Sequence, residues 1–392
     1  MTGALGAGGI ASAVPAAPPE PAVVDHPRLL TPEWLTAALR AGGHDATVRG
    51  VRHEPVGTGQ MAASHRLHLD LAPGAGPDVP TSLVAKLPTP DVAARSLVGG
   101  AYHTEAAFYA EIAPTVAIRV PACHHHAIAD DHATFTLLLE DMAPATQGDQ
   151  IAGCTAEEAR RAAVNLAGLH GPRWSDPTLH DHDWLLAPDA EGAVLLREIL
   201  VSATDAFVDR YGPRMARDDV ATLRAVAEAI GDWVLGRTTP YGLVHGDYRL
   251  DNLLFASVGG SADAGANASG DAGAGPAGVA GVAAVDWQTV SIGLPGRDIA
   301  YLLGTGLDPG ERRRYEDDLV AAYHAALVGH GVAGYSLDDC LADYRYGAVQ
   351  GPLVTVLGAA YGAPTDRGDD MFMTMAARSC AQVRDLATLD LV

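Results

Sequence analysis

The stretch that decides the fold reads His245-Gly-Asp-Tyr-Arg-Leu-Asp-Asn-Leu-Leu-Phe255, and Val285-Asp-Trp287 follows it thirty residues later. Asp247, Asn252 and Asp286 have the spacing that the kinase template requires of a catalytic carboxylate and two magnesium ligands. Transfer of a γ-phosphoryl group builds charge on oxygen atoms, so the site needs hard oxygen ligands and one carboxylate near the attacking hydroxyl. We therefore interpret the stretch as a phosphoryl-transfer site in which Asp247 accepts the proton and Asn252 and Asp286 hold Mg²⁺.

Two apolar runs, 253–255 and 282–285, flank this site and are expected to be strands. Residues 256–281 between them are largely Gly, Ala, Ser and Asp. Such a composition cannot bury enough apolar surface to order itself, so we expect a flexible insertion. The alternative for the whole stretch is a solvated, Asp-rich turn after a strand. The register of Asn252 and Asp286 disfavours that alternative.

Lysine usage gives a second, independent argument. The chain has 26 basic residues, of which 25 are arginines and one is Lys86. Lys86 lies in the apolar run 82–88, where a lone charge is costly unless it is paired. The kinase pattern Val-Ala-Ile-Lys places a lysine on the third strand, in contact with the α- and β-phosphates. Chance survival of a lysine at an exposed strand end is the alternative.

The expected partner of Lys86 is a glutamate on the next helix. Residues 102–112 have helical periodicity, and Glu105 falls on their apolar face. A carboxylate that faces the core requires a cation, and Lys86 is the only lysine in the chain. Glu111 lies roughly 240° further around the helix and belongs to the solvent side. The alternative is that Glu105 lies at the helix margin and reaches water.

Upstream, Val56-Gly-Thr-Gly-Gln-Met-Ala-Ala-Ser64 precedes an alternating run of residues, 65–71. This pattern predicts a hairpin whose turn lies over phosphates, with Gly57, Gly59 and Ser64 as candidate nucleotide contacts. Ala62 stands where a third glycine would be, and the segment precedes a strand, which argues against a Rossmann turn or a Walker loop. A plain glycine-bearing hairpin turn is the alternative.

Taken in order, these motifs resemble the kinase-like small-molecule phosphotransferases, the aminoglycoside phosphotransferase and choline kinase superfamily, and most of all its ecdysteroid-kinase-like branch and bacterial relatives. His245-Gly-Asp replaces the His-Arg-Asp of protein kinases, and Asp286-Trp-Gln replaces Asp-Phe-Gly. No Ala-Pro-Glu follows, so a protein substrate is not expected. The resemblance covers residues 30 to 390.

The resemblance implies an α+β, bilobal, protein-kinase-like fold. A small N-terminal lobe, residues 26–138, would hold an antiparallel sheet and one key helix. Residues 139–145 would form a hinge, and residues 146–392 a larger, mainly helical C-terminal lobe with the catalytic loop, the metal site and the acceptor pocket. Residues 1–25 are rich in Ala, Gly and Pro, so we expect a disordered tail.

The resemblance also implies roles for single residues. ATP and Mg²⁺ would be the cofactors, and the hinge residues Glu140, Asp141 and Met142 would lie against the adenine, offering backbone groups. Arg249 would lie near the γ-phosphate as a second catalytic residue. Asp298 would brace the catalytic loop from a helix N-terminus. His245 is interpreted as a scaffold residue that hydrogen-bonds the loop.

Composition limits the partners. The 48 acidic residues outnumber the 26 basic ones, and the formal charge of −22 argues against nucleic-acid or anionic-membrane partners. No run of 18 apolar residues appears, and the N-terminus lacks a basic-then-apolar signal pattern, so a cytoplasmic protein is expected. The four cysteines form no Cys-x-x-Cys pair. The tract 124–126 is three histidines, which we interpret as a turn or strand entry more readily than as a metal site.

We therefore predict an ATP-dependent kinase that acts on a hydroxyl of a small molecule, with Asp247 as the base. One alternative is a catalytically idle nucleotide-binding or sensor module on the same fold. Another is a metal-dependent hydrolase that uses His245, Asp247 and Asp286 as ligands, which leaves Lys86 and Glu105 unexplained. An aminoglycoside, a steroid or other polycyclic alcohol, a sugar and an amino alcohol would all satisfy these motifs as acceptors. The sequence carries no pattern that predicts an oligomeric state.

Overall fold

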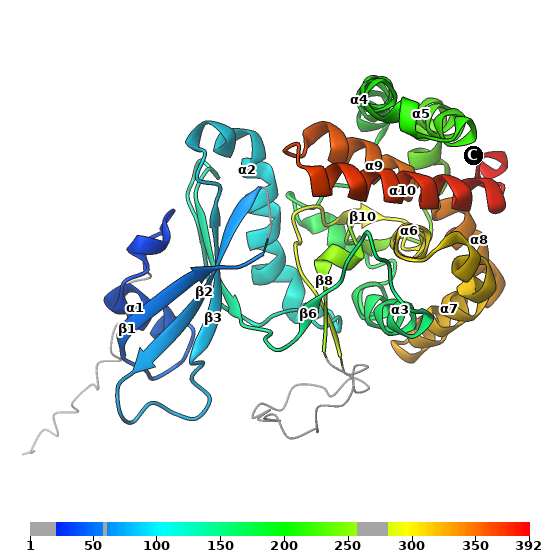
Figure 1. The fold of residues 1–392 in the computed structure, drawn as a ribbon. Coiled ribbons are helices and arrows are strands. Elements are labelled where there is room, and N and C mark those ends of the chain that lie inside the picture. The colour runs from blue at the N-terminus through cyan, green and yellow to red at the C-terminus, as the bar shows by residue number, and fades with distance from the viewer. Residues whose placement is uncertain (1–20, 58–60, 257–280) are drawn as a thin grey trace, which may run out of the picture.

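The computed structural model describes residues 21–57, 61–256 and 281–392. Gly59 of the predicted phosphate loop lies outside the described residues, as does nearly all of the predicted insertion 256–281. Figure 1 shows two lobes side by side, a smaller one built around a sheet and a larger one built mainly of helices. The predicted mixed α+β class, with an antiparallel sheet in the N-terminal part and a helical C-terminal part, is confirmed.

The N-terminal lobe is a five-stranded antiparallel sheet between two helices. Its strands follow the order β1-β2-β3-β5-β4 and have the bounds β1 Val48–Pro55, β2 Ala62–Leu71, β3 Ser82–Pro88, β4 Cys123–Ile128 and β5 Phe135–Glu140. Helix α1, Pro32–Ala41, begins at the N-cap Thr31 and packs near β1 and β4. Helix α2, Val92–Ala107, contacts β4 and β5, and continues into a π-helical turn, Phe108–Ile112.

Alternation along β3 decides which face each side chain takes. Leu83, Ala85 and Leu87 are fully buried in one apolar cluster with the buried residues of α1. Because successive residues of a strand point to opposite faces, Lys86 lies on the other face, toward α2. The strand therefore places the single lysine on the side from which Glu105 approaches.

The chain just before α1 is part of this lobe. Val24 is buried, its N–H donates to Thr136 Oγ1 at 2.9 Å, and the same hydroxyl donates to the Val24 carbonyl at 2.8 Å. Asp25 accepts a hydrogen bond from Arg95 Nη1 at 2.8 Å. Residues 21–25 therefore pack on the N-terminal lobe, and the prediction that the disordered tail reaches residue 25 is wrong for these five residues. The polar contacts of Val24 and Asp25 span 112 and 70 positions in sequence, which no local pattern reveals.

The C-terminal lobe is a layered set of helices (Figure 1). They are α3 Ala156–His170, α4 Ala190–Tyr211, α5 Arg217–Gly236, α6 Gly296–Gly306, α7 Pro309–Gly329, α8 Leu337–Gly347, α9 Gln350–Tyr361 and α10 Asp366–Asp385. Helix α3 has Thr155 as its N-cap and a capping box in which the Thr155 hydroxyl and the Glu158 carboxylate each accept from the other's backbone N–H. Among the described residues, no helix is long and apolar enough to cross a membrane.

Short strands carry the functional loops between these helices. They are β6 Thr146–Gln147, β7 Gly242–Val244, β8 Leu253–Phe255, β9 Val282–Ala284 and β10 Ser291–Gly293. β8 and β9 pair antiparallel with Leu253 opposite Ala284, which confirms the two predicted strands. The Val285 N–H donates to the Asn252 carbonyl at 3.0 Å, so this pairing brings the chain before Asp286 next to Asn252.

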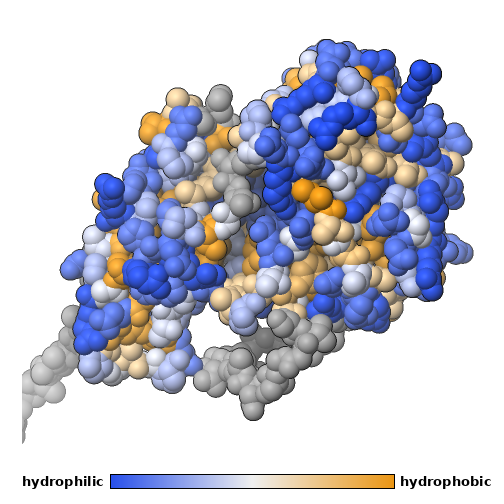
Figure 2. Space-filling view, in the orientation of Figure 1, coloured by the Kyte–Doolittle hydropathy of each residue, from blue (hydrophilic) through white to orange (hydrophobic). Residues whose placement is uncertain are grey.

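Figure 2 shows that hydrophilic residues cover most of this face of the C-terminal lobe, with apolar residues in small groups. This surface agrees with a chain that has 48 acidic residues. The largest fully buried side chains include Trp233 and Trp287.

Candidate active site

Lys86 joins the two lobes. Its Nζ lies 2.6 Å from Glu105 Oε2 on α2 and 2.9 Å from Asp286 Oδ1, which follows β9 in the C-terminal lobe. The Glu105 side chain is 1% exposed and that of Lys86 is 13% exposed, so the ammonium is largely withdrawn from water. The predicted pairing of Lys86 with Glu105 is therefore present. Burial alone would lower the pKa of Lys86, but the carboxylates of Asp286 and Glu105 raise it above its ordinary value.

A buried tyrosine fixes α2 to the sheet. The Tyr102 hydroxyl donates to the Met61 carbonyl and accepts from the Thr89 N–H at 3.0 Å. These contacts connect α2 to the start of β2 and the end of β3. Because Glu105 is three residues further along α2, it lies on the same face of the helix as Tyr102 and is held over the strand that carries Lys86.

The backbone of the catalytic loop, His245–Asn252, is held by α6. The N–H groups of His245 and Gly246 donate to the two carboxylate oxygens of Asp298, at 2.6 and 3.0 Å. Asp298 is fully buried and lies in the first turn of α6. Burial alone would raise its pKa, but its hydrogen bond with His170 and the adjacent donors hold the pKa below its usual value. The expected bracing contact is therefore present, with an ionised carboxylate as its centre.

Gly246 has a local reason to be glycine. Its φ is +81°, and a Cβ at this position would come within 2.7 Å of the Thr289 carbonyl oxygen. Both the left-handed backbone and the close approach exclude ordinary side chains. The turn that this residue makes aims the next residue, Asp247, into the space between the lobes.

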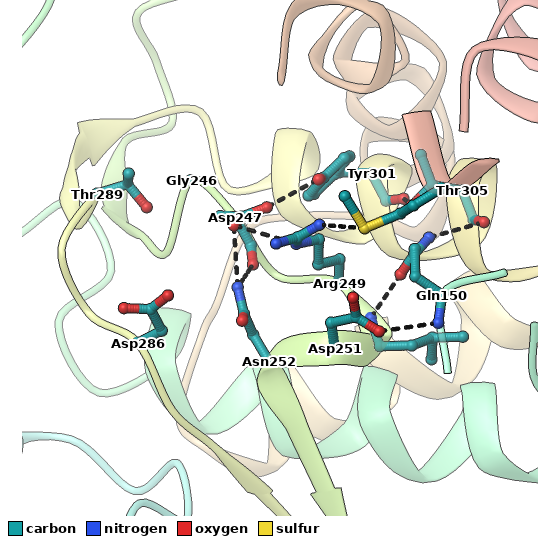
Figure 3. A network of polar contacts seen from close by, with 12 residues as sticks. Gln150, Gly246, Asp247, Arg249, Asp251, Asn252, Asp286, Thr289, Tyr301 and Thr305 are labelled. Atoms are coloured by element: carbon teal, nitrogen blue, oxygen red, sulfur yellow. Dashed lines mark hydrogen bonds and ion pairs between the residues drawn. The ribbon is translucent and has the colours of Figure 1, made fainter. Parts of the chain in front are cut away.

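Asp247 is held from three sides (Figure 3). Its Oδ1 accepts a hydrogen bond from the Tyr301 hydroxyl at 2.8 Å, and its Oδ2 accepts one from Asn252 Nδ2 at 2.9 Å. Arg249 Nε lies 3.2 Å from the same Oδ2. The three contacts fix the orientation of the carboxylate. The Asp247 side chain is nevertheless 20% exposed, so it is still open to a substrate.

Asn252 and Asp286 have the donor set that magnesium requires. The Asn252 Nδ2 group donates both to the Asp247 carboxylate and to the Asp247 carbonyl, each at 2.9 Å. This leaves the amide oxygen, which accepts no hydrogen bond within the described part of the chain. The Asp286 side chain is 35% exposed, and Lys86 contacts only its Oδ1. A carboxylate and an amide oxygen are suitable ligands for a hard divalent cation, so the residues fit the predicted metal.

His245 is occupied within the loop. One ring nitrogen, Nε2, lies 3.1 Å from the Val285 carbonyl, and the other, Nδ1, accepts from the Asp247 N–H at 3.3 Å. With both nitrogens engaged, the ring stiffens the loop and is not free to ligate a metal. This observation counts against the metal-dependent hydrolase, which requires His245 as a ligand.

The side chains of the predicted hinge residues 140–142 contact other residues of the protein. Glu140 accepts from Arg119 Nη2 at 2.6 Å and from the Ala122 N–H at 3.0 Å. Asp141 accepts from Arg66 Nε at 2.8 Å. Met142 Sδ lies 3.5 Å from Arg119 Nη2. These side chains therefore tie the segment to Arg66 of β2 and to the chain just before β4.

Of the residues predicted to contact the nucleotide from the phosphate loop, the structure describes Gly57 and Ser64. Gly57 has a φ of +78°, a backbone conformation that favours glycine. Ser64 on β2 is directly opposite Lys86 on β3, so the two side chains share one face of the sheet. Gly59 is not among the described residues.

The sequence interpretation missed several residues next to the catalytic loop. Gln150 Oε1 accepts from the Leu250 N–H at 2.8 Å, and the Gln150 N–H donates to Asp251 Oδ1 at 3.0 Å (Figure 3). Arg367 of α10 holds both oxygens of Asp251 at 3.1 Å. Tyr301 is the other omission, although a signal for it existed, since it follows Asp298 by three positions on one helix and therefore shares its face.

Two family models match the chain. The ecdysteroid kinase-like family matches residues 236–331, and the phosphotransferase enzyme family matches residues 76–262. The two ranges overlap at the catalytic loop and together extend over both lobes. No curated protein matches.

Solved structures were also compared. The GDP complex of aminoglycoside 2'-phosphotransferase-IIIa is 14% identical, with 86% of this chain and 94% of that chain covered and a TM-score of 0.49. The Plasmodium vivax ethanolamine kinase is 12% identical, with 84% and 82% covered and a TM-score of 0.47. Spectinomycin phosphotransferase in complex with ADP and spectinomycin is 12% identical, with 92% and 98% covered and a TM-score of 0.44. At these values we draw no conclusion about substrates from the alignments.

Proposed function

Because the chain belongs to the kinase-like small-molecule phosphotransferase superfamily, to which both matching families belong, we propose that it transfers the γ-phosphate of MgATP to a hydroxyl group of a small molecule. The observation that carries the proposal is the contact of Lys86 with both Glu105 and Asp286, beside a loop that presents Asp247. Phosphoryl transfer uses a cation with carboxylate partners, here Lys86 with Glu105 and Asp286. It also uses a separately held carboxylate, here Asp247.

Asp247 is the proposed base. Tyr301 and Asn252 each donate to one of its oxygens, which fixes the carboxylate plane toward the space where an acceptor hydroxyl would bind. An oriented carboxylate can take the hydroxyl proton as the new O–P bond forms, and general-base catalysis of this kind contributes roughly 10²- to 10⁴-fold.

Lys86 is the proposed phosphate contact. Glu105 is buried and holds the ammonium from the side of α2, so the lysine stem cannot turn away from the cleft. Its charge would offset the negative charge of the α- and β-phosphates. Asn252 and Asp286 would hold magnesium, which neutralises charge on the phosphate oxygens when it is bound. Arg249, 3.2 Å from Asp247, is placed to add positive charge near the transferred group.

The test is transfer of labelled γ-phosphate from ATP, with Mg²⁺, into a fractionated extract of hydroxylated metabolites. Asp247→Asn serves as the blank, because it keeps the shape of the side chain and removes its basicity. We expect a labelled product with the wild type, and a rate reduced at least about 100-fold in the variant. Binding of MgATP, measured by calorimetry, should differ little between the two proteins.

Two results would contradict the proposal. Equal transfer by the wild type and Asp247→Asn would remove Asp247 from the mechanism. MgATP binding without transfer into any fraction or into a panel of aminoglycosides, sterols, sugars and amino alcohols would favour the idle nucleotide-binding module.

A further inference from the structure

A cavity of about 220 Å³ lies in the C-terminal lobe, apart from the residues of the candidate active site. Residues of α5, α8 and β10 contribute to its lining, and Figure 1 shows that all three elements belong to that lobe. Three aromatic side chains, Trp233, Tyr241 and Tyr346, form part of the wall, and Ile292 and Leu294 add aliphatic surface. A space of this size and lining suits a small ring-shaped ligand.

The aromatic walls are held in place before any ligand arrives. Trp233 Nε1 donates to the Tyr346 carbonyl at 2.8 Å, and the Tyr346 hydroxyl donates to the Trp233 carbonyl at 2.6 Å. The guanidinium carbon of Arg297 lies 4.6 Å from the centre of the Trp233 ring, and that of Arg237 lies 5.0 Å from the Tyr346 ring. Such reciprocal contacts reduce the ordering that a ligand would have to induce.

The charge of the cavity is opposite to that of the protein. Its lining includes Arg237, Arg297 and His180, and no Asp or Glu is among the described residues that line it. The whole chain has a formal charge of −22. A lining that excludes acidic side chains in so acidic a protein favours an anionic occupant.

Arg297 forms no ion pair with a carboxylate among the described residues. Its Nε and Nη2 donate to the neutral Gln350 Oε1 at 3.0 and 2.8 Å, and its Nη1 has no hydrogen-bond partner in the described residues. Arg237, by contrast, already contacts Asp343 Oδ1 at 2.6 Å. Burial lowers the pKa of Arg297 to about 10, although the charge of the neighbouring Asp298 acts in the opposite direction. The group is still cationic at neutral pH.

Gln350 fixes Arg297 from behind. Its Nε2 donates to the Gly246 carbonyl of the catalytic loop at 2.8 Å, so its oxygen is turned toward the guanidinium. Arg297 is thereby preorganised, and its Nη1 remains available as a donor.

We propose that this cavity binds a small aromatic acid, namely a single ring that bears one carboxylate. The ring would lie against the aromatic and aliphatic walls, and the carboxylate would accept a charge-assisted hydrogen bond from Arg297 Nη1. A cavity of about 150 Å³ is known to hold benzene, so 220 Å³ accommodates a ring and a carboxylate. An inorganic anion would leave the apolar walls uncovered.

The first experiment compares benzoate, benzyl alcohol and benzylamine, which share a ring and differ in charge. Binding to the full chain is measured by calorimetry at neutral pH. We expect benzoate to bind at least tenfold more tightly than benzyl alcohol, and benzylamine to bind most weakly. Equal affinity for benzoate and benzyl alcohol would overturn the proposal.

Two variants locate the site. Arg297→Gln should reduce the affinity for benzoate to the affinity for benzyl alcohol, and it should leave the affinity for benzyl alcohol unchanged. Thr238→Glu changes an exposed side chain of the lining, so it should not disturb folding. The added carboxylate should weaken the binding of benzoate and strengthen the binding of benzylamine. Arg49→Gln, in an exposed pair with Asp70 on the other lobe, is the matched control. Benzoate binding that survives both cavity substitutions would place the ligand elsewhere and refute the inference.

Discussion

At the scale of single residues, the site is built from neighbours that hold one another. Asp247 has a hydrogen bond to each carboxylate oxygen, and Lys86 has a carboxylate on each lobe. None of these groups depends on a bound ligand for its position. Such preorganisation is what electrostatic catalysis requires, because no binding energy is then spent on arranging the groups.

Tyr301→Phe tests whether the orientation of Asp247 matters. The substitution removes only the hydroxyl that donates to Asp247 Oδ1 at 2.8 Å. A hydrogen bond to a charged group contributes roughly 1.5 kcal/mol or more, so we expect kcat for transfer to fall about tenfold. Tyr211→Phe removes a similar bond, to Asp369 at 2.7 Å on α10, and should leave kcat unchanged. Equal rates in the wild type and Tyr301→Phe would show that Asn252 and Arg249 orient the carboxylate without the tyrosine.

Glu105→Gln tests the environment of Lys86 without any substrate. The carboxylates of Asp286 and Glu105 raise the pKa of Lys86 in spite of burial, so little of the amine is neutral at pH 7 to 8. Removal of one carboxylate should lower this pKa and speed acylation by an amine-reactive reagent several-fold. Because Lys86 is the only lysine, peptide mass spectrometry reads the rate at one site. A Glu33→Gln variant, at an exposed helix start, is the control. Unchanged labelling in Glu105→Gln would contradict the electrostatic role.

Local patterns predicted the Lys86–Glu105 pair because strand alternation and helical periodicity each assign a side chain to a face. They also predicted the strands β8 and β9, from two short apolar runs. Gln150 was missed because a glutamine in a loop has no distinctive spacing, and Tyr301 was missed although its place three positions after Asp298 indicated a shared helix face. Their roles depend on which segments the fold brings together, and these segments are fifty to a hundred positions apart.

At the scale of elements, α6 is the part that organises the catalytic loop. Its first turn presents Asp298 to two loop N–H groups, and Tyr301 one turn later reaches Asp247. The start of α6 also approaches α8 closely, since a Cβ on Gly296 would come within 2.6 Å of the Asp343 carbonyl oxygen. The helix is therefore fixed on one side by backbone packing and fixes the loop on the other.

Asp298→Asn should cost about 2 kcal/mol of unfolding free energy at pH 7, because two loop N–H groups lose a charged acceptor. The pKa of Asp298 is held below its usual value of 3.8 in the folded protein, so its ionic contribution is fully present above that pH. It is lost as the pH falls through the lower folded value. The difference between variant and wild type should therefore be constant above about pH 5 and shrink below pH 3.8.

Urea unfolding at several pH values measures that difference. Asp189→Asn, at the N-cap of α4, is the control, since asparagine caps a helix as well as aspartate does. A deficit that stays constant down to pH 3 would show that Asp298 contributes through shape and not through its charge.

At the scale of the whole molecule, the two lobes meet around Glu105 and Asp286. Phe108 and Trp287 stack across this boundary, with ring centres 3.8 Å apart, and Gln288 Nε2 donates to Glu105 Oε2 at 3.3 Å. The sequence predicted the two lobes and the hinge region but not this stacked pair, since nothing local links a helix end to a residue about 180 positions later. The proposed nucleotide site is thus formed only when both lobes are folded and in contact.

A non-hydrolysable ATP analogue should therefore stabilise the whole chain in one step. At a free concentration 100 times its Kd, a ligand that binds only the folded state adds about 2.7 kcal/mol to the unfolding free energy. Asp286→Asn should lose the part of this gain that depends on Mg²⁺, while Lys86 and Glu105 stay paired and the fold is kept. The measurement is Tm with the analogue, in Mg²⁺ or in EDTA, with Asp70→Asn as an exposed control. If Mg²⁺ raised the Tm of Asp286→Asn as much as that of the wild type, Asp286 would not be a metal ligand and the proposed arrangement of the cleft would be wrong.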